Sequence, residues 1–576
     1  MKSLKYLTLF LMAGILFSCT KKNDTPDPEV VGSMTDLVVS TDFNWSAGLV
    51  GQLNISFVNP NNVSLEREYV QIIDEQGNVL DRTMVYDSSA TFHLQLAQDA
   101  TYYVYFPVTN DMMAIESLGN ITMELGETVE YINPNLKSTR VVTCTACDSP
   151  LVNAGGEDPY LASGYTIINE SQVPGWQTTA TDSKIEIWSS GFQGVPAQEG
   201  HNFFELNANQ VASLYQELCL EPGATIYWSV WHRGRSGVDV ADVKIGATVE
   251  TAEFQATMTD GKTAWGYYSG SYNVPLGQTT TVFVFESISA TGGNRSYGNF
   301  LDNFEISCDF DGDGIIDRWD DLPDDPDASF ITHFPESGKQ IVAFEDLWPS
   351  YGDFDFNDLI LSNQAIITSN GLGTPLEASF KVSIDAIGAS FDNGFAMMLY
   401  DENKAAFGEN IISEITGDAS LDPDNTNGLI ISNDVFETIN DRYQNNGEGP
   451  EGVPDTLRFT ITFNENAAAF IPELYLFRTN DRGHEVHRSG FPLTATANPA
   501  LFNTEDDAGD YKSATGLPWG IEILTDQIYQ NPIEKVDILI AYPKFGSWAT
   551  SNGVSDPLWY QEPVSDKVVD IDFDGL

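Results

Sequence analysis

Apolar and polar residues alternate along most of the chain with a period of two, which is typical of β-strands with one buried face. Leu53, Ile55 and Phe57 fall on one face of such a segment, and Phe380 and Val382 on one face of another. Turn-forming residues separate these segments, and no long stretch has the 3.6-residue period of an amphipathic helix. The pattern therefore predicts an all-β protein with several β-sandwich domains.

Shifts in composition along the 576 residues divide this β-rich chain into segments. The expected segments are a signal peptide at 1–19, a tether at 20–34, a small β-sandwich at 35–130, a linker at 131–150, a second β-rich domain at 151–308, an acidic loop at 309–329 and a larger β-rich domain at 330–576. The fold class is thus a chain of sandwiches with one short acidic linker.

The charge of the chain excludes one class of partner. It has 84 acidic and 27 basic side chains, a formal net charge of −57. A field of this sign repels the phosphates of nucleic acids. The acidic residues gather in short loops rich in Gly and Asn, which is the arrangement of calcium ligands. Calcium is therefore the expected cofactor.

The N-terminus indicates where the protein resides. Residues 1–19 combine two lysines with a short apolar run and end in Leu16-Phe17-Ser18-Cys19, too short a run for a membrane span. This end resembles the lipobox of bacterial lipoproteins. The resemblance implies cleavage before Cys19, its acylation, and an anchor in the bacterial outer membrane that faces the periplasm or the cell surface. An ordinary signal peptide with an incidental cysteine is the alternative, and no feature identifies a protein partner.

Four further cysteines lie in or beside the second domain. They are Cys144, Cys147, Cys219 and Cys308. An even number in an oxidising compartment predicts two disulfides, and we expect one of Cys144 and Cys147 to pair with Cys308. A zinc site would normally add a second close Cys or His pair, whereas Cys219 and Cys308 each stand alone.

Residues 148–308 resemble galactose-binding-like jelly rolls. The motifs are LVNAGGE at 151–157, VPGW at 173–176, Gln216 with Pro222-Gly223, and GNFLDN at 298–303. Many members of that family are carbohydrate-binding modules. The resemblance implies a jelly roll and a structural calcium between Glu157 and Asp302.

Sugar binding requires a flat apolar face and fixed polar groups for hydroxyls. The candidate face is Trp176, Trp188 and Trp265, and the candidate polar groups are Glu186, His232, Arg233 and Arg235. The alternative is that the tryptophans belong to the core and that an arginine pairs with Glu186. A glycan is the expected partner on the first interpretation only.

The acidic loop begins with DFDGDGIIDRWD at 309–320. Its expected ligands are the side chains of Asp309, Asp311, Asp313, Asp317 and Asp320 and the carbonyl of Ile315. Such close carboxylates repel one another without a cation. The continuation DLPDDP at 321–326 resembles thrombospondin type 3 repeats, which wrap calcium. A solvated acidic linker is the alternative.

A second acidic motif lies in the C-terminal domain. As an extended segment, it would place Asp353, Asp355 and Asn357 on one face and two phenylalanines on the other. Asp358, Glu345 or Asp346 would complete the six to eight ligands of a calcium site. An exposed acidic strand is the alternative.

Residues 335–562 resemble the LruC-domain family of bacterial lipoproteins. The motifs are FEDLWPSYGDFDFNDL at 344–359, GASFDNGF at 388–395, RGHEVH at 482–487, LPW at 517–519 and AYP at 541–543. The resemblance implies an envelope location and no known reaction.

No catalytic motif is recognisable in the sequence. His484 and His487 are three residues apart, whereas a zinc protease needs two histidines four apart on a helix. The expected function is a non-enzymatic, lipid-anchored calcium-binding protein with a glycan-binding or adhesive role. A polysaccharide hydrolase with catalytic carboxylates in the C-terminal domain and a purely structural envelope protein are the alternatives.

Overall fold

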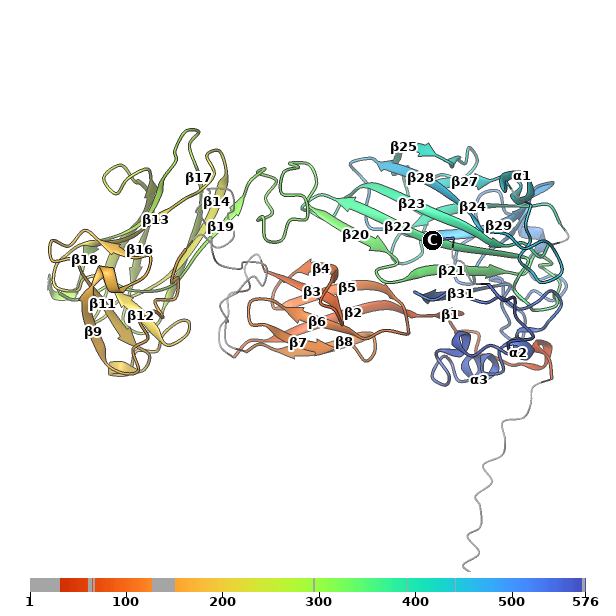
Figure 1. The fold of residues 1–576 in the computed structure, drawn as a ribbon, viewed down its shortest axis with the longest axis horizontal. Helices are drawn as coiled ribbons and strands as arrows, with labels where there is room; N and C mark the ends of the chain where they lie inside the picture. Colours follow the sequence, from red (N-terminus) through yellow and green to blue (C-terminus); the bar gives the residue numbers. More distant parts are fainter. Residues whose placement is uncertain are drawn as a thin grey trace, which may run out of the picture.

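The computed structural model describes residues 32–60, 65, 68–126, 151–293, 296–389, 391–440, 442–571 and 575–576. These residues form several β-sandwiches with a few short helices, which confirms the all-β, multi-domain fold class. The second sandwich lies at one end of an elongated molecule and the C-terminal domain at the other (Figure 1). Throughout the described ranges, no helix has the length and apolar character needed to cross a membrane.

The first sandwich spans residues 49–124. Its sheets have the orders β5-β2-β8 and β4-β3-β6-β7. The strands are β2 (Leu49–Val58), β3 (Tyr69–Asp74), β4 (Val79–Met84), β5 (Ser89–Leu96), β6 (Tyr102–Phe106), β7 (Asp111–Ala114) and β8 (Gly119–Glu124). The alternating positions Leu53, Ile55 and Phe57 enter its core, as the sequence pattern predicts.

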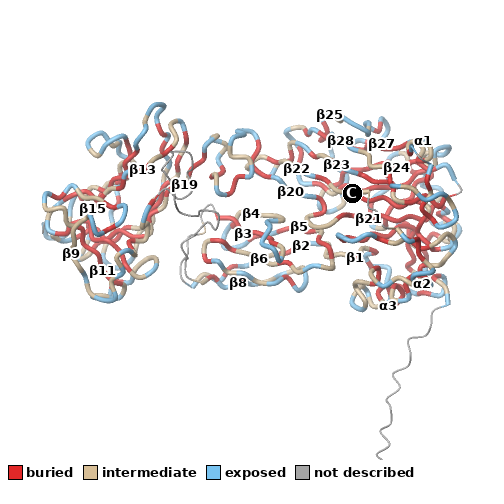
Figure 2. Tube along the Cα trace, in the orientation of Figure 1, coloured by how far each residue is buried: buried red, intermediate tan, exposed pale blue. Residues whose placement is uncertain are grey.

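The second sandwich spans residues 165–309. Its antiparallel sheets have the orders β10-β13-β18-β15-β16 and β17-β14-β19-β12-β11-β9. The elements are β9 (Tyr165–Asn169), η2 (Glu170–Gln172), β10 (Gln177–Thr178), β11 (Lys184–Ser189), η3 (Phe192–Gly194), β12 (Asn202–Glu205), β13 (Ser213–Leu218), β14 (Thr225–Arg233), β15 (Asp239–Gly246), β16 (Glu253–Asp260), β17 (Gly266–Asn273), β18 (Thr281–Ser289), η4 (Thr291–Gly293) and β19 (Phe300–Asp309). Buried residues of both sheets form the core between them. The strands that carry these residues contain many red, buried positions in Figure 2.

The C-terminal domain is a larger sandwich. An eight-stranded sheet, β1-β31-β21-β22-β23-β28-β25 with β20 beside β22, faces a five-stranded sheet, β26-β27-β24-β29-β30. Its elements are β20 (Phe330–Phe334), β21 (Lys339–Phe344), β22 (Leu359–Ser369), β23 (Pro375–Ala386), β24 (Asn393–Tyr400), β25 (Ile412–Gly417), β26 (Ser420–Leu421), β27 (Gly428–Ser432), α1 (Val435–Thr438), β28 (Asp455–Phe463), β29 (Ile471–Arg478), β30 (Asp481–Val486), η5 (Pro499–Leu501), β31 (Gly520–Thr525), α2 (Ile538–Ala541), α3 (Phe545–Thr550) and η6 (Trp559–Gln561).

Residues 34–47, which we call the strap, belong to the C-terminal domain. They contain η1 (Met34–Asp36) and β1 (Ser46–Ala47), and β1 pairs in parallel with β31. Met34 is fully buried, and its backbone N–H donates to Asp537 at 2.8 Å. The expected boundaries, a tether ending at 34 and a sandwich starting at 35, are therefore corrected. The strap lies against the other end of the chain because its apolar side chains find their core there.

Aromatic side chains hold the strap in place. The Trp45 ring lies 5.8 Å from the Phe545 ring and 5.9 Å from the Trp548 ring. Its indole N–H donates to the carbonyl of Gly516 at 3.1 Å. The strap therefore completes the C-terminal core.

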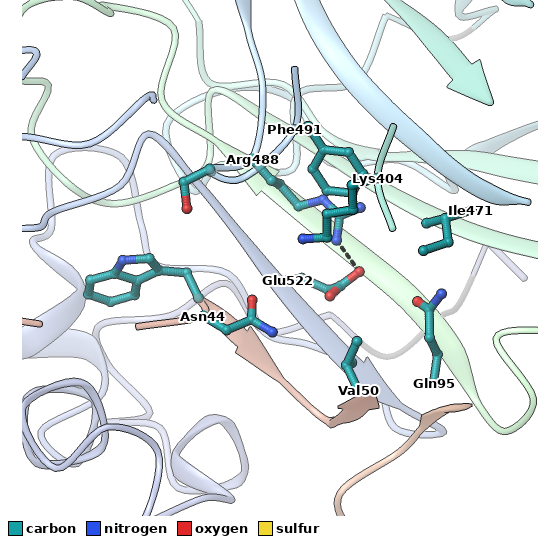
Figure 3. A pocket seen from close by; sticks show the side chains of 11 residues that line it. Asn44, Val50, Gln95, Lys404, Ile471, Arg488, Phe491 and Glu522 are labelled. Carbon is teal, nitrogen blue, oxygen red and sulfur yellow. Dashed lines mark hydrogen bonds and ion pairs between the residues drawn. The ribbon is translucent and has the colours of Figure 1, made fainter. Parts of the chain in front are cut away.

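A small cavity of about 30 Å³ lies where the strap, the first sandwich and the C-terminal domain meet. Asn44 and Gln95 approach it from one side and Lys404 and Arg488 from the other (Figure 3). Arg488 is buried and forms ion pairs with Glu473, at 2.6 Å, and Glu522. Glu473 belongs to β29 and Glu522 to β31, so Arg488 connects the two sheets of the C-terminal domain. The first sandwich is joined to that domain by the backbone N–H of Gln95, which donates to Glu336 at 2.6 Å.

Candidate metal centres and binding face

The acidic loop runs from the end of β19 to the start of β20 (Figure 1). Ile315, Ile316 and Trp319 turn inward and pack against Tyr69 of the first sandwich and Phe330 of the C-terminal domain. The loop therefore has a small core of its own, and its carboxylates are left at the surface of that core.

The first candidate metal centre is the cluster of Asp309, Asp311 and Asp313. One carboxylate oxygen of each lies within 4.8 Å of the other two. The backbone N–H groups of Gly312 and Gly314 donate to Asp309 at 2.6 and 3.1 Å. Both glycines have a positive φ, 83° and 102°, which lets the loop curl around one point.

Two carboxylate oxygens in this centre have no protein partner. The Oδ2 atoms of Asp311 and Asp320 are buried and accept no hydrogen bond. Burial, and then the like charges of Asp313, Asp311 and Asp317, raise the pKa of Asp320 to about 7. Burial also raises the pKa values of Asp309 and Asp311. Carboxylate oxygens of this kind are the ligands that a hard divalent cation prefers.

The other two expected ligands of this loop line its turn. The Asp317 carboxylate accepts the N–H of Phe310 at 2.8 Å, and the N–H of Ile315 donates to Asp313 at 2.7 Å. Metal binding by this loop stays a prediction for all six expected ligands, the Ile315 carbonyl and Asp317 included.

The second candidate metal centre contains Glu345, Asp353 and Asp355, whose oxygens also lie within 4.8 Å of one another. Glu345 is fully buried, and its Oε2 atom has no partner. A Cβ atom at Gly352 would clash with that oxygen, so a side chain at this position would displace the Glu345 carboxylate. Glu345, which the sequence offers only as an alternative to Asp346, is thus a member of the cluster.

The backbone of this centre differs from the expected strand. Residues 353–358 form a loop before β22, and Phe354 and Phe356 have φ values of 58° and 52°. Such left-handed conformations cost energy in residues other than glycine. Both rings are nevertheless buried, as the alternation predicts. Left-handed turns at the two rings bend the segment, so the acids converge on Glu345.

Further oxygens surround the second centre. Asp358 accepts the N–H of Asp346 at 2.8 Å, and the amide oxygen of Asn357 is buried without a partner. Burial, and then the charge of Asp346, raise the pKa of Asp358 to about 9, and burial with the charge of Asp353 raises that of Asp355 to about 8. The carboxyl groups of the second centre are therefore too close together and too deeply buried for all of them to be ionised without a counter-ion.

The calcium expected between Glu157 and Asp302 has weaker support. Glu157 accepts the N–H groups of His201 and Asn202, both at 2.7 Å, and Asp302 accepts that of Gln198 at 2.6 Å. Neither residue belongs to a three-ligand cluster within the described part of the chain. This site stays a prediction.

The expected sugar-binding face is wrong, because its residues are enclosed. Trp176 lies in the core of the second sandwich, where large aromatic residues gain most from burial. Trp188 is 1% exposed and lies under the Arg235 guanidinium, 4.7 Å from the ring centre. Trp265 is half-buried, and its indole N–H donates to the carbonyl of Pro196.

The polar residues expected on that face form hydrogen bonds or ion pairs with other residues of the protein. The buried Glu186 accepts the indole N–H of Trp188, and Arg235 pairs with the neighbouring Glu205 at 2.8 Å rather than with Glu186. His232 is fully buried between Asp260 and Asn299, at 2.8 Å from each. Arg233 is buried and donates to the carbonyl of Lys262.

An open groove, which the sequence analysis missed, lies on the outer face of the six-stranded sheet. It has a volume of about 190 Å³. Its floor is formed by outward residues of three strands, namely Tyr227 and Ser229 of β14, Tyr267, Ser269 and Ser271 of β17, and Glu305 and Ser307 of β19. In the sequence, only the alternation of residues on these strands indicates an outward face there. The walls of the groove come from distant parts of the chain, so no local pattern predicts the groove.

The predicted lipidation and disulfide sites are mostly outside the described residues. Cys19, Cys144 and Cys147 are not among the residues that the structure describes. Cys219 and Cys308 are disulfide-bonded. The expected pairing of Cys308 with one of Cys144 and Cys147 stays a prediction.

Comparison with known proteins adds a partial family match. A family model described as a domain of unknown function, DUF4842, matches residues 376–560. No curated protein matches the sequence. The LruC resemblance stays a prediction.

Among solved structures, one described as "Putative lipoprotein from Bacteroides ovatus" has a TM-score of 0.33 and 15% identity, over 68% of this chain and 98% of its own. The CBM22-2 xylan-binding domain of Paenibacillus barcinonensis Xyn10C has a TM-score of 0.19 and 15% identity, over 25% of this chain and 97% of its own. The CBM22-1–GH10 part of Clostridium thermocellum Xyn10B, complexed with xylohexaose, has a TM-score of 0.18 and 17% identity, over 23% of this chain and 26% of its own. These likenesses are too distant to carry an argument about function.

Proposed function

We propose that this chain is a calcium-binding protein of the bacterial cell envelope, anchored by lipid at Cys19, that binds a glycan without chemical turnover. The observation that carries the proposal is the pair of carboxylate clusters, each with buried oxygens that lack a partner.

Without a cation, each of the two clusters lowers the stability of the folded chain. Charges about 4 Å apart repel by about 4 kcal/mol at an effective dielectric constant near 20, and each cluster brings three carboxylates within 4.8 Å. In the second cluster, burial and like charges raise the pKa of Asp355 to about 8 and that of Glu345 well above its usual value, so without a cation these carboxyls must take up protons at neutral pH, which lowers the stability of the fold. A calcium ion neutralises two charges and takes six to eight oxygens, which these loops offer in side chains and carbonyls. Asp309, Asp311, Asp313 and Asp320 would hold one ion, and Glu345, Asp353 and Asp355 the other.

Calorimetric titration of calcium into the metal-free chain tests the proposal. We expect two sites, of which Asp311→Asn removes one and Asp355→Asn the other. Asp566→Asn is a matched control, because its carboxylate is 74% exposed and belongs to neither cluster. A wild-type chain that gives no binding heat, or variants that retain both sites, would contradict the proposal.

The glycan part of the proposal is supported by the groove on the six-stranded sheet. Tyr227 and Tyr267 supply aromatic surface, and Ser269 and Ser271 are exposed hydroxyls beside them. Aromatic rings next to a row of hydroxyl groups suit the apolar faces and hydroxyls of a neutral sugar.

Replacing Tyr267 by alanine is expected to reduce glycan binding about 5- to 150-fold, because a packed aromatic contact is worth about 1–3 kcal/mol. Tyr267 is chosen because Tyr227 also touches Asp309, at 3.4 Å. Phe254→Ala is the control, since Phe254 is 60% exposed on the opposite sheet. A printed array of plant, algal and bacterial polysaccharides measures the change. Equal loss in both variants would contradict the groove assignment.

The same array separates the alternative functions. A structural protein would retain no polysaccharide, and a hydrolase would shorten the polysaccharide that it retains. We place the hydrolase second because the clustered acids of the C-terminal domain have a role as calcium ligands.

A further inference from the structure

The groove on the second sandwich has walls from two other parts of the chain. Ile316 and Arg318 of the acidic loop form one wall, and Glu68 of the first sandwich another. The groove therefore exists only while the second sandwich, the loop and the first sandwich keep their relative positions.

Arg318 makes the ion-paired bridge across this junction. One guanidinium nitrogen lies 2.6 Å from Glu68 of the first sandwich, and the other lies 3.2 Å from Glu305 of the second. Glu68 is 4% exposed, and its other oxygen has no partner, so losing Arg318 would leave a buried charge unpaired. Glu305 is itself part of the groove floor and accepts a hydrogen bond from Ser229 at 3.3 Å.

The first candidate metal centre fixes the position of Arg318. Arg318 lies between Asp317 and Asp320, and Asp320 has its unpartnered oxygen in the charge field of Asp311 and Asp313. The N–H of Asp317 donates to the carbonyl of Cys308 at 2.7 Å, at the end of β19. A cation bound by the aspartates would lock this turn, and their mutual repulsion without a cation would open it.

We infer that calcium in the acidic loop controls the groove: the ion holds Arg318 between Glu68 and Glu305, and so closes the wall against which a neutral oligosaccharide binds. This inference rests on the proposed function and adds its regulation. No residue of the groove floor belongs to the carboxylate cluster, but Tyr227 of the floor donates a hydrogen bond to Asp309 at 3.4 Å. Calcium therefore acts on the sugar site through the Arg318 bridge and through this hydrogen bond.

Two consequences follow from thermodynamic linkage. A saccharide in the groove tightens calcium binding by the same factor by which calcium tightens saccharide binding. Breaking the bridge weakens the coupling of the two events, whose remaining link is the hydrogen bond from Tyr227 to Asp309, and leaves both sets of direct ligands in place.

Small-angle X-ray scattering of the chain from residue 20, without its lipid, tests the inference with calcium as the probe. We expect EGTA to increase the radius of gyration of the wild type, because the second sandwich separates from the first. Arg318→Ala should show the larger radius in saturating calcium while it still binds calcium in a calorimetric titration. Glu305→Gln, which acts on a half-buried residue from the other side, should show the same expansion without risk to the core.

Lys244→Ala is the matched control. It removes the ion pair of Lys244 with Glu286, which lies on the opposite sheet of the second sandwich, and should leave the radius unchanged. If the wild type binds no calcium at the loop, the proposed function fails together with the inference. If it binds calcium but stays equally compact in EGTA, or if Arg318→Ala and Glu305→Gln stay compact, the inference is overturned and the calcium-binding function stands.

Discussion

Replacing Trp45 by alanine is expected to lower the free energy of unfolding of the C-terminal domain by about 3–5 kcal/mol. The indole is 4% exposed and packs among Phe43, Phe545 and Trp548. Its removal leaves a cavity in a core that the strap and the C-terminal part of the chain build together. It also removes the hydrogen bond from the indole N–H to the carbonyl of Gly516. Urea denaturation followed by tryptophan fluorescence measures the change.

Val38 provides the control within the same strap. It is 71% exposed, so Val38→Ala should change the stability by less than about 0.5 kcal/mol. If Trp45→Ala were as mild as Val38→Ala, the strap would not be part of the C-terminal core.

Chelating calcium with EGTA is expected to lower the melting temperature of the C-terminal domain by about 5–10 °C. An ion present at a hundred times its dissociation constant stabilises the folded state by about 2.7 kcal/mol, and each kcal/mol shifts the melting temperature of a domain of this size by about 2–4 °C. The loss arises because Glu345, Asp353 and Asp355 must then share one site without a cation. Differential scanning calorimetry measures it.

Glu345→Gln gives the matching variant. Burial, and then the charges of Asp358 and Asp355, raise the pKa of Glu345 well above its usual value. The amide keeps the shape of the buried side chain and removes the cost of protonating or ionising that carboxyl in the metal-free state. The variant should melt above the wild type in EGTA, and calcium should no longer raise its melting temperature. A wild type that melts at the same temperature with and without EGTA would refute the second metal centre.

Local features of the sequence were predictable because their causes are local. The alternation at Leu53, Ile55 and Phe57 fixes which side of β2 is buried. The spacing of Asp309, Asp311 and Asp313 brings their oxygens together because the loop closes within five residues, and glycines permit its turns.

Features that depend on distant contacts were not predictable. The strap joins residues some 470 positions apart, as in the hydrogen bond from Trp45 to Gly516, and nothing near Trp45 indicates that partner. The groove likewise needs Glu68, Arg318 and Glu305 from three parts of the chain. The tryptophans of the second sandwich were misassigned because composition alone does not separate a core ring from a ligand-binding ring. At Asp353 and Asp355, the convergence of the acids was predictable but the left-handed backbone between them was not.

The most direct measurement of the calcium claim is anomalous X-ray scattering from crystals grown in calcium chloride. The account predicts an anomalous peak among Asp309, Asp311 and Asp313 and a second among Glu345, Asp353 and Asp355, each with oxygen ligands at about 2.3–2.6 Å. Ordered carboxylates in both clusters with water and no anomalous density between them would contradict it.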